Sequence, residues 1–482
     1  MKTLTHQKLK LITAILLFLS TSAFVSAQEN AAEPADTLYP ILEQVQSDLS
    51  VMKRLKISGY IQAQYQKIDT SGMDSYAGGN FAKELDNRFS VRRGRLKFAY
   101  ENQLSQYVIQ FDVTEKGLGI KDAYAAFTEP WTKAFSLWTG VFNKPFGYEI
   151  EYSSNTRETP ERSRMYQVLF PGERDLGAKL VFQPWKTSKY NYIKFDIGMF
   201  NGNGTNVETD QYKDMIAHLT LNKTFLSEKL KLGLGASYYN GGIRQVTKYV
   251  YSIGDVTTYN AYTSGTGIKT DTATAMTSLK AFRADSTGVS GDKVKRQYYG
   301  LESQISYDWA LGLTTLRGEY LWGTQPGLAG SSASFTALPT GDLYSRNFSG
   351  YYVNFVQNLG QSPLGIVLKY DSYDPNTDIS GDEIALASKE FPKNPVLTVK
   401  DAAGVVTKSF AAPIATTGLA DIKYTTLGMG IMYRWNSSVR LTVYYDMVKN
   451  ETTSKIVNGS TLKDYSKDRT DNVLTLRFQY KF

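Results

Sequence analysis

The 482-residue sequence contains no cysteine and only two histidines. The absence of cysteine excludes a disulfide framework, a thiol nucleophile, a lipid-modified N-terminal cysteine and any Cys-ligated metal or cluster. Several histidine ligands at one site are also excluded, because His6 lies in a segment that we expect to be removed and His218 is then the only one left. We therefore expect no cofactor and no metal site.

The sequence also lacks a long apolar run of the ~18–20 residues that a transmembrane helix needs. Its N-terminus has Lys2, Lys8 and Lys10, the apolar run 11–19, and Val25-Ser26-Ala27 before Gln28. This order predicts a secretory signal peptide, residues 1–27, cleaved near Ala27. Its removal takes away three lysines and no acid, which lowers the formal net charge from +8 to +5. Such a small excess does not indicate a nucleic-acid partner.

Tyrosine, phenylalanine and glycine are abundant, with 34, 23 and 39 residues. An exported chain that is rich in aromatic residues and has neither cysteine nor a spanning helix has the profile of a β-barrel in the outer membrane of a Gram-negative bacterium. A large secreted β-protein fits the composition nearly as well. The pattern along the chain therefore has to decide between these two classes.

Three regions follow from that pattern. After the signal peptide, residues 28–55 form a spacer with a short amphipathic helix, because Leu42, Val45, Leu49 and Met52 recur at steps of three and four residues; we expect it in the periplasm. From residue 56 to 482, alternation of apolar and polar residues predicts an all-β domain with about sixteen strands. The predicted strands are 56–66, 88–101, 106–114, 120–129, 134–143, 174–184, 191–201, 212–225, 229–241, 295–309, 312–323, 346–358, 363–373, 421–435, 438–449 and 470–482.

Short and long connections tend to alternate between these strands. Membrane barrels have tight turns on one rim and long loops on the other, whereas a soluble sandwich has no reason to separate them. The final strand alternates apolar and polar residues and ends on Phe482. Such an ending resembles the recognition signal of proteins that the outer-membrane assembly machinery inserts. Together these features predict a transmembrane antiparallel β-barrel.

The strand 87–100, NRFSVRRGRLKFAY, is the most basic part of the predicted wall. Its alternation slips by one residue near Arg92–Gly94, which predicts a bulge at Gly94. If the apolar face of each strand contacts lipid, the opposite face lines the lumen. Cations on that face can favour anions, since guanidinium offers a fork of donors to oxyanions. The predicted anion pathway comprises Arg92, Arg93, Arg95, Lys97, Lys179, Lys194, Arg434 and Arg440.

The alternative role for these cations is structural, because the same rule places carboxylates in the lumen. If the two sets pair, the cations hold the barrel's shape and do not meet a permeating anion. The predicted lumenal acids are Asp112, Asp196, Glu302, Asp308, Glu319, Asp371 and Asp446.

The connection 144–173 is rich in arginine, and we expect it to fold into the barrel and narrow it. Lys144, Arg157, Arg162 and Arg164 would then form a constriction. The alternative is an exposed surface loop.

Several motifs resemble the phosphate-selective porin O/P family. They are the arginine-rich strand 87–100, the pattern G-x-F-x-x-P-F-G-x-E at 140–149, Ser153-Ser154, Glu161-Arg162-Ser163 and Arg174-Asp175-x-Gly177. The resemblance covers residues of about 56–200 and the last strand, and loops 242–294 and 374–420 carry none of it. The many predicted lumenal acids depart from the family pattern.

This resemblance implies an anion channel of about sixteen strands that usually forms a homotrimer. It assigns Arg92, Arg93, Arg95 and Lys97 to an arginine-rich wall, and Lys144 with 161–163 to the inward loop. The expected function is passive diffusion of small anions such as phosphate, with no catalytic step.

The alternatives are a weakly selective general porin, or a barrel whose long loops serve adhesion. A hydrolase built on His218 is a third, although no nucleophile motif accompanies that residue. The Ser/Thr/Gly-rich segment 252–292 is interpreted as an extracellular loop.

Overall fold

The computed structural model describes residues 38–258, 260–264, 267–271, 277–285, 288–385, 397–400, 406–410, 414–453 and 461–482. The barrel unit spans Leu55–Phe482, and the residues before it form a separate unit. In that first unit, helix α2 (Leu38–Arg54) is present where the sequence predicts a helix. Among the described residues, no helix is long and apolar enough to cross a membrane.

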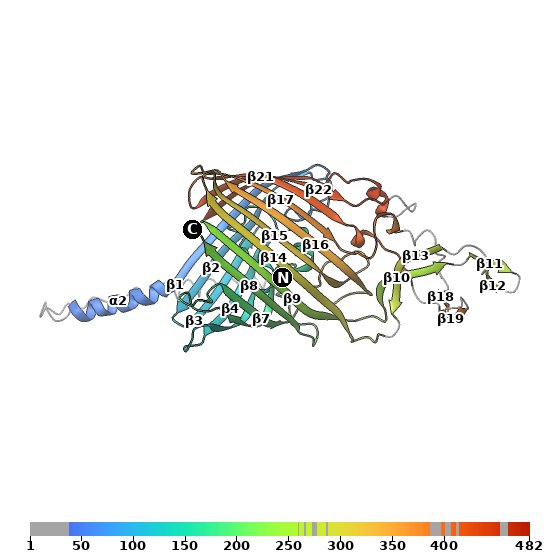
Figure 1. The fold of residues 1–482 in the computed structure, drawn as a ribbon, viewed down its shortest axis with the longest axis horizontal. Coiled ribbons are helices and arrows are strands. Elements are labelled where there is room, and N and C mark those ends of the chain that lie inside the picture. Colours follow the sequence, from blue (N-terminus) through green and yellow to red (C-terminus); the bar gives the residue numbers. More distant parts are fainter. Residues whose placement is uncertain are drawn as a thin grey trace, which may run out of the picture. The chain divides into compact units, whose positions relative to one another are not determined.

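Sixteen antiparallel strands close into a barrel, and each pairs with the next along the wall until the last pairs with the first. Figure 1 shows the strands running steeply tilted across the barrel. The strands are β1 (Leu55–Ile68), β2 (Asn87–Asn102), β3 (Ser105–Thr114), β4 (Gly117–Thr128), β5 (Phe135–Asn143), β6 (Arg174–Phe182), β7 (Ile193–Phe200), β8 (Asp214–Phe225), β9 (Leu230–Arg244), β14 (Lys293–Trp309), β15 (Gly312–Gly327), β16 (Leu343–Asn358), β17 (Leu364–Asp374), β21 (Tyr424–Arg434), β22 (Val439–Asn450) and β23 (Val473–Lys481).

The strands confirm the predicted barrel, and every boundary falls within a few residues of the predicted one. One rim, here the short-turn rim, carries brief connections such as 103–104 and 310–311 together with the chain end Phe482. The other, the long-loop rim, carries 69–86, 144–173 and 375–423; its one brief connection is 115–116. The predicted separation of short and long connections is therefore confirmed.

The apolar face of each strand points away from the lumen, because a membrane barrel has lipid on its outside. On β21, Leu427, Met429 and Ile431 are all exposed, as are Leu476 and Phe478 on β23. Aromatic residues gather at two levels of this surface. On β14, the levels are marked by the exposed residues Tyr299 and Tyr307. The strand between them, at roughly 3.4 Å per residue and a tilt of about 40°, spans roughly 20 Å along the barrel axis, close to the height of an apolar membrane band.

The predicted slip in β2 is present, but the bulge lies two residues before Gly94, where it was predicted. Gln62 pairs with Arg93 and Ala63 with Val91, so Arg92 is the extra residue of the bulge. Gly94 has a different role: a Cβ atom there would lie 2.3 Å from the carbonyl oxygen of Val113. Only glycine allows β2 and β3 to approach this closely.

The segment 252–292, interpreted from its composition as a loop without strands, contains further strands. β10 (Val250–Thr258) pairs with β13 (Thr277–Asp285), and β10 also pairs in parallel with β16. The prediction was based on the Ser/Thr/Gly-rich composition, but threonine is common in strands, so this composition did not exclude them. The remaining elements are β11 (Asn260–Ser264), β12 (Gly267–Asp271), β18 (Leu397–Lys400), β19 (Val406–Phe410), β20 (Ile414–Ala415), η1 (Gly381–Glu383), η2 (Leu419–Asp421) and η3 (Thr461–Ser466).

Candidate functional site

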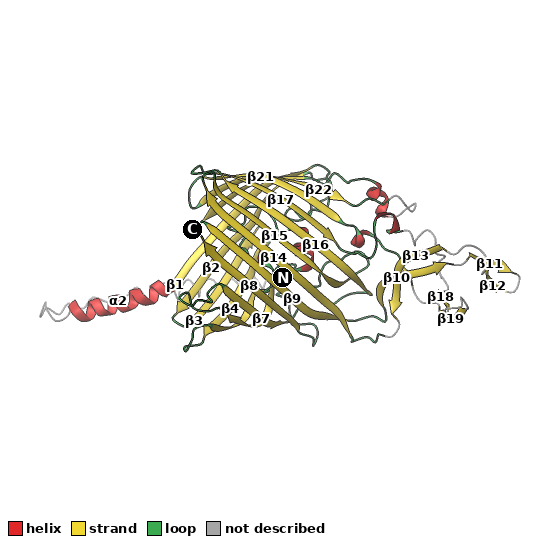
Figure 2. Ribbon diagram, viewed as in Figure 1, coloured by secondary structure: helices red, strands yellow, loops and turns green. Residues whose placement is uncertain are grey.

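The connection 144–173 folds into the lumen, as the sequence predicts, and carries the helices α3 (Tyr148–Glu151) and α4 (Arg164–Leu169). Figure 2 shows helical segments within the outline of the barrel. The loop reaches strands on several sides of the wall. The hydroxyl groups of Ser154 and Tyr60 on β1 are 2.6 Å apart, and Lys369 on β17 lies 2.6 Å from Glu149. It is therefore anchored across the bore.

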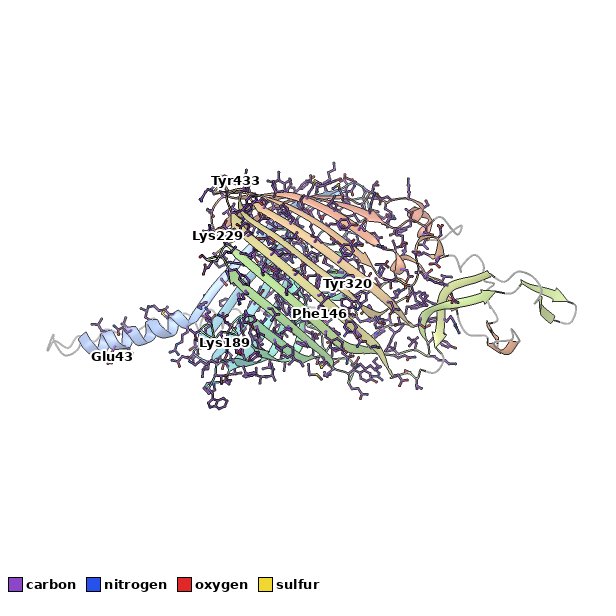
Figure 3. The ribbon with its side chains drawn as sticks, in the orientation of Figure 1. Glu43, Phe146, Lys189, Lys229, Tyr320 and Tyr433 are labelled. Atoms are coloured by element: carbon purple, nitrogen blue, oxygen red, sulfur yellow. The ribbon has the colours of Figure 1, made fainter. Side chains whose placement is uncertain are left out.

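An apolar core fixes the loop against one half of the wall. Phe146, Ile150, Tyr166 and Phe170 of the loop are fully buried and pack on the inward face of the strands between β7 and β17. Figure 3 places Phe146 amid the barrel strands. The wall contributes Phe200, Ile216, Tyr239, Tyr298, Leu321, Phe348, Tyr352 and Tyr373.

These lumenal aromatics are functional positions that the sequence analysis missed. It assigned apolar faces to lipid, and that rule fails where a loop fills the lumen. A signal was available in the Tyr-Tyr pairs at 238–239, 298–299, 351–352 and 444–445. Because neighbouring strand residues face opposite sides, one tyrosine of each pair must point inward. In the structure these are Tyr239, Tyr298, Tyr352 and Tyr444.

The start of the loop is held by a single carboxylate of β15. The amide groups of Tyr148 and Glu149 each donate a hydrogen bond of 2.8 Å to Glu319. The hydroxyl groups of Tyr166 and Tyr352 donate to the same carboxylate. A Cβ atom at Gly147, which has a φ of 64°, would overlap the Tyr166 hydroxyl, so glycine is required for this turn.

The far side of the loop is held by Glu161, which binds three arginines. Its carboxylate lies 2.9 Å from Arg92, 2.8 Å from Arg93 and 2.9 Å from Arg477 on β23. We call Glu161 with these arginines the Glu161 latch. Burial alone would raise the pKa of Glu161, but the arginines hold it well below its ordinary value. Two residues of the predicted anion pathway, Arg92 and Arg93, are thus ion-paired with the loop.

The predicted constriction residues have different partners from one another. Lys144 forms an ion pair of 3.2 Å with Asp175, and Arg162 pairs with Glu173. Arg157 is buried and donates to the carbonyl groups of Thr159 and Pro160. The guanidinium of Arg164 lies over two tyrosine rings, 3.7 Å from the ring centre of Tyr424 and 4.3 Å from that of Tyr76. They therefore support the loop from several sites rather than form one ring.

The other half of the lumen is open. A cavity of about 510 Å³ lies beside the loop and the inward faces of β1–β7. Its lining contains seven cations and two carboxylates, Asp122 and Glu151. The cations are Arg95, Lys97, Arg162, Arg174, Lys179, Lys194 and Lys481.

Several of these cations are partly neutralised by nearby acids. Arg174 lies 3.0 Å from Asp122, and both Lys179 and Lys194 lie 2.9 Å from Asp196. These pairs lower the charge that an ion in the cavity would experience. The positive potential in the cavity therefore depends mainly on the cations that have no close acidic partner.

The least compensated cations lie in one group beside β1. Tyr60 is paired with Arg95 on one side and with Lys481 on the other, so these residues share a row of the wall. Arg95 is 3.5 Å from Asp112, and its Nε has no hydrogen-bond partner. Neither Lys97 nor Lys481 forms an ion pair with a residue that the structure describes. We call Arg95, Lys97 and Lys481 the free cation group.

Arg434 and Arg440, the last two residues of the predicted pathway, do not line this cavity. Arg440 donates to the carbonyl groups of Thr156 and Arg157 and therefore supports the loop. Arg434 ends β21 at the short-turn rim. Lys481, by contrast, belongs to the free cation group although the sequence analysis did not select it for the pathway.

A second, much smaller space, here called the narrow passage, lies between the inward loop and residues of β17, β21 and β22. It holds about 30 Å³, room for about two water molecules, and shares Arg162 with the large cavity. Beyond it, a cavity of about 410 Å³ shares Arg164 and Asp471 with the passage. The charged residues that line the narrow passage are mixed in sign: Glu161, Asp371, Asp446 and Asp471 with Arg162, Arg164 and Lys369.

Sixteen strands, a lipid-facing apolar surface and an inward loop define a porin-like barrel of the outer-membrane type. No family model matches the chain, and no curated protein matches it.

Among solved structures, the chain is similar to OmpT of Vibrio cholerae in a trimer form, with 10% identity and a TM-score of 0.45 over 89% of this chain and 99% of that chain. It is also similar to the outer membrane channel DcaP of Acinetobacter baumannii, with 12% identity and a TM-score of 0.46 over 89% and 97% of the two chains. A third similar structure is Salmonella typhi OmpF in complex with daunomycin, with 12% identity and a TM-score of 0.44 over 89% and 97%.

Proposed function

We propose that the chain is a porin of the Gram-negative outer membrane through which small anions, phosphate-like oxyanions first, diffuse passively. The observation that carries the proposal is the lining of the lumenal cavity beside the loop, where seven cationic side chains face two acidic ones. Such a lining raises the local concentration of anions and lowers that of cations. The motif resemblance to the phosphate-selective porin O/P family supports the same class of permeant.

The free cation group is the part of the wall that we assign to the anion. An oxyanion can accept hydrogen bonds from Lys97 and Lys481 without displacing an ion pair, and from Arg95, whose one ion pair, with Asp112, is long at 3.5 Å. Arg92 and Arg93 would first have to leave Glu161. The carboxylates of the narrow passage oppose the effect of the cavity. We therefore propose a moderate anion preference, which requires no catalytic step or cofactor.

The orientation follows from the rims. The short-turn rim with Phe482 would face the periplasm, and the long loops would face the outside of the cell.

We also propose a homotrimer. An apolar groove of about 610 Å³ on the lipid-facing surface of β1, β2, β22 and β23, lined by Tyr65, Phe89 and Leu441, supports a subunit contact there. Native mass spectrometry in detergent tests this assembly, and a monomer alone would contradict it.

The test of selectivity is the reversal potential in a planar bilayer under a salt gradient. Wild type is expected to give the sign for anions, and the double variant Lys97→Glu, Lys481→Glu to reduce or invert it. For an ion about 10 Å away, the four units of charge change its energy by about 0.6 kcal/mol after screening. The anion-to-cation ratio should then fall roughly eightfold.

The matched control is Lys189→Glu, Lys229→Glu, which makes the same change of charge in turns of the same rim but outside the cavity (Figure 3). It should keep the wild-type reversal potential. Cation preference in wild type, or equal effects of the two double variants, would contradict the proposal. A wild-type reversal potential of zero would indicate a weakly selective porin.

A further inference from the structure

A polar cluster lies where the inward loop meets the wall at β7 and β8. Its members are Glu151 of the loop, Asp196 of β7 and His218 of β8, and the donor atoms of all three lie within 4.8 Å of one another. Asp196 and His218 are direct partners across the two strands. Both are only 1% exposed. Glu151 lines the large cavity, so the cluster is buried on the wall side and reachable from the lumen.

His218 has no hydrogen bond on either ring nitrogen among the described residues. The nearest carboxylate oxygens are that of Glu151, 3.9 Å from Nδ1, and that of Glu302 on β14, 3.3 Å from Nε2. Neither contact has the geometry of a hydrogen bond. The imidazole can pair with these two carboxylates only as a cation. Without a proton or a metal ion, its buried nitrogen atoms have lost water and gained no partner, which is costly.

One carboxylate oxygen beside the imidazole also lacks a partner: Glu302 Oε2 is buried and has no hydrogen-bond partner among the described residues. Asp196 is held by lysines instead, because its Oδ1 lies 2.9 Å from Lys179 and its Oδ2 lies 2.9 Å from Lys194. A metal ion bound to Asp196 would therefore take the place of the Lys194 ammonium group and would give the imidazole a ligand bond.

We propose that Glu151, Asp196 and His218 form a binding site for a divalent transition-metal ion such as Zn²⁺ or Cu²⁺. One imidazole nitrogen and two carboxylate oxygens provide three protein ligands, and the fourth position faces the cavity for water. Glu302 lies on the other side of the imidazole ring and can orient it by accepting a hydrogen bond from the nitrogen that the metal does not use.

The lysines around the cluster determine which metals the site prefers. Lys179 and Lys194 lie 2.9 Å from oxygens of Asp196, and Lys194 also lies 3.2 Å from Glu151. These ammonium groups already compensate most of the negative charge. Hard cations such as Mg²⁺ and Ca²⁺ depend on that charge and on oxygen ligands, so they gain little here. A borderline metal gains the imidazole bond as well and can displace Lys194 into the cavity.

Occupation of the site would join the loop to the wall, because Glu151 belongs to the loop and the other ligands to strands. It would also add positive charge beside the cavity. The inference does not depend on the anion preference, since it concerns the cluster alone.

The test uses the folded exported chain, purified without a polyhistidine tag and titrated with Cu²⁺ under electron paramagnetic resonance. We expect one bound Cu²⁺ per chain with the signature of a single nitrogen ligand. His218→Gln should remove that signature and weaken binding at least roughly tenfold. Glu151→Gln should keep the nitrogen signature and also weaken binding. Zn²⁺ should compete for the site, whereas a large excess of Mg²⁺ should not.

The control is Glu228→Gln, which removes an exposed carboxylate from the β8–β9 turn at the short-turn rim, outside the cluster, and should bind as wild type. Heat-modifiable electrophoretic mobility checks that each variant barrel is folded. Because Glu151 lies in the loop, its variant remains informative if His218→Gln does not fold. A nitrogen signature that persists in His218→Gln, wild-type binding by Glu151→Gln, competition by Mg²⁺, or no stoichiometric Cu²⁺ would each overturn the proposal.

Discussion

Replacement of Glu161 by glutamine tests the Glu161 latch most directly. The change keeps the shape of the side chain but removes the charge that Arg93 and Arg477 share. Both arginines are buried, and the loss of one partner in a buried ion pair costs about 3–5 kcal/mol. The glutamine oxygen can still accept one hydrogen bond, so we expect the lower end of that range.

The substitution should destabilise the docked position of the loop rather than the barrel, because strand pairing does not involve Glu161. A loss of about 3 kcal/mol raises the population of the released loop roughly 150-fold. In single-channel recordings, we expect larger conductance and frequent steps between two current levels. The anion preference should also increase, because the lumen loses one negative charge and three arginines become accessible.

Arg92→Gln is the internal comparison. Arg92 binds the same carboxylate, but its side chain is 30% exposed, against 3% for Arg93. Its contribution should therefore stay below about 1 kcal/mol, with conductance close to wild type. If Glu161→Gln has wild-type conductance, selectivity and current noise, the latch does not hold the loop and the reasoning is refuted.

Three further results are expected. Gly94→Ala should lower the folding yield, because its Cβ would meet the Val113 carbonyl, while Gly119→Ala, with open space around it, should fold as wild type in the same heat-modifiability assay. The Glu161 carboxylate has a pKa well below its ordinary value, so its stabilisation of the docked loop is fully present above the unfolded-state pKa and is lost only as pH falls through the lowered pKa. Conductance should therefore show no loop release between pH 7 and pH 5, and release at pH 5 would contradict this. Deletion of Phe482 removes two backbone hydrogen bonds to Gly59, of 3.2 and 3.0 Å, and should reduce the amount of assembled barrel in membranes; an unchanged amount would show that the contact is dispensable.

The strands were predictable because each one shows the alternation that a wall between lipid and water imposes. The bulge near Arg92 was predictable for the same reason, since a slip in alternation needs an extra residue. The destination of the basic face, the lumen, also followed from alternation. Local pattern therefore determined the strands and the side of the wall that the basic residues face, but not the inward side chains of the lumenal aromatic residues.

The partners of those residues were not predictable. Glu161 binds Arg93 at a separation of 68 residues and Arg477 at 316, and it does so only because an apolar core fixes the path of the loop. That core depends on inward aromatic residues, which contradict the rule that apolar residues face lipid. The pairing of Arg92 and Arg93, and the lack of it at Lys97, follow from tertiary packing that no local pattern contains.

The Glu161 latch also has a consequence for the order of assembly. Arg93 lies on β2 and Arg477 on β23, on either side of β1, where the first and last strands of the barrel meet. The complete set of arginines exists only after β23 has joined β1, so the loop cannot dock fully on a growing, open sheet. Until that moment the apolar core and Glu319 can hold the start of the loop, but its Glu161 side lacks Arg477 as a partner. Full docking of the loop is thus coupled to closure of the barrel, and a chain whose last strand has not paired would lack the complete Glu161 latch.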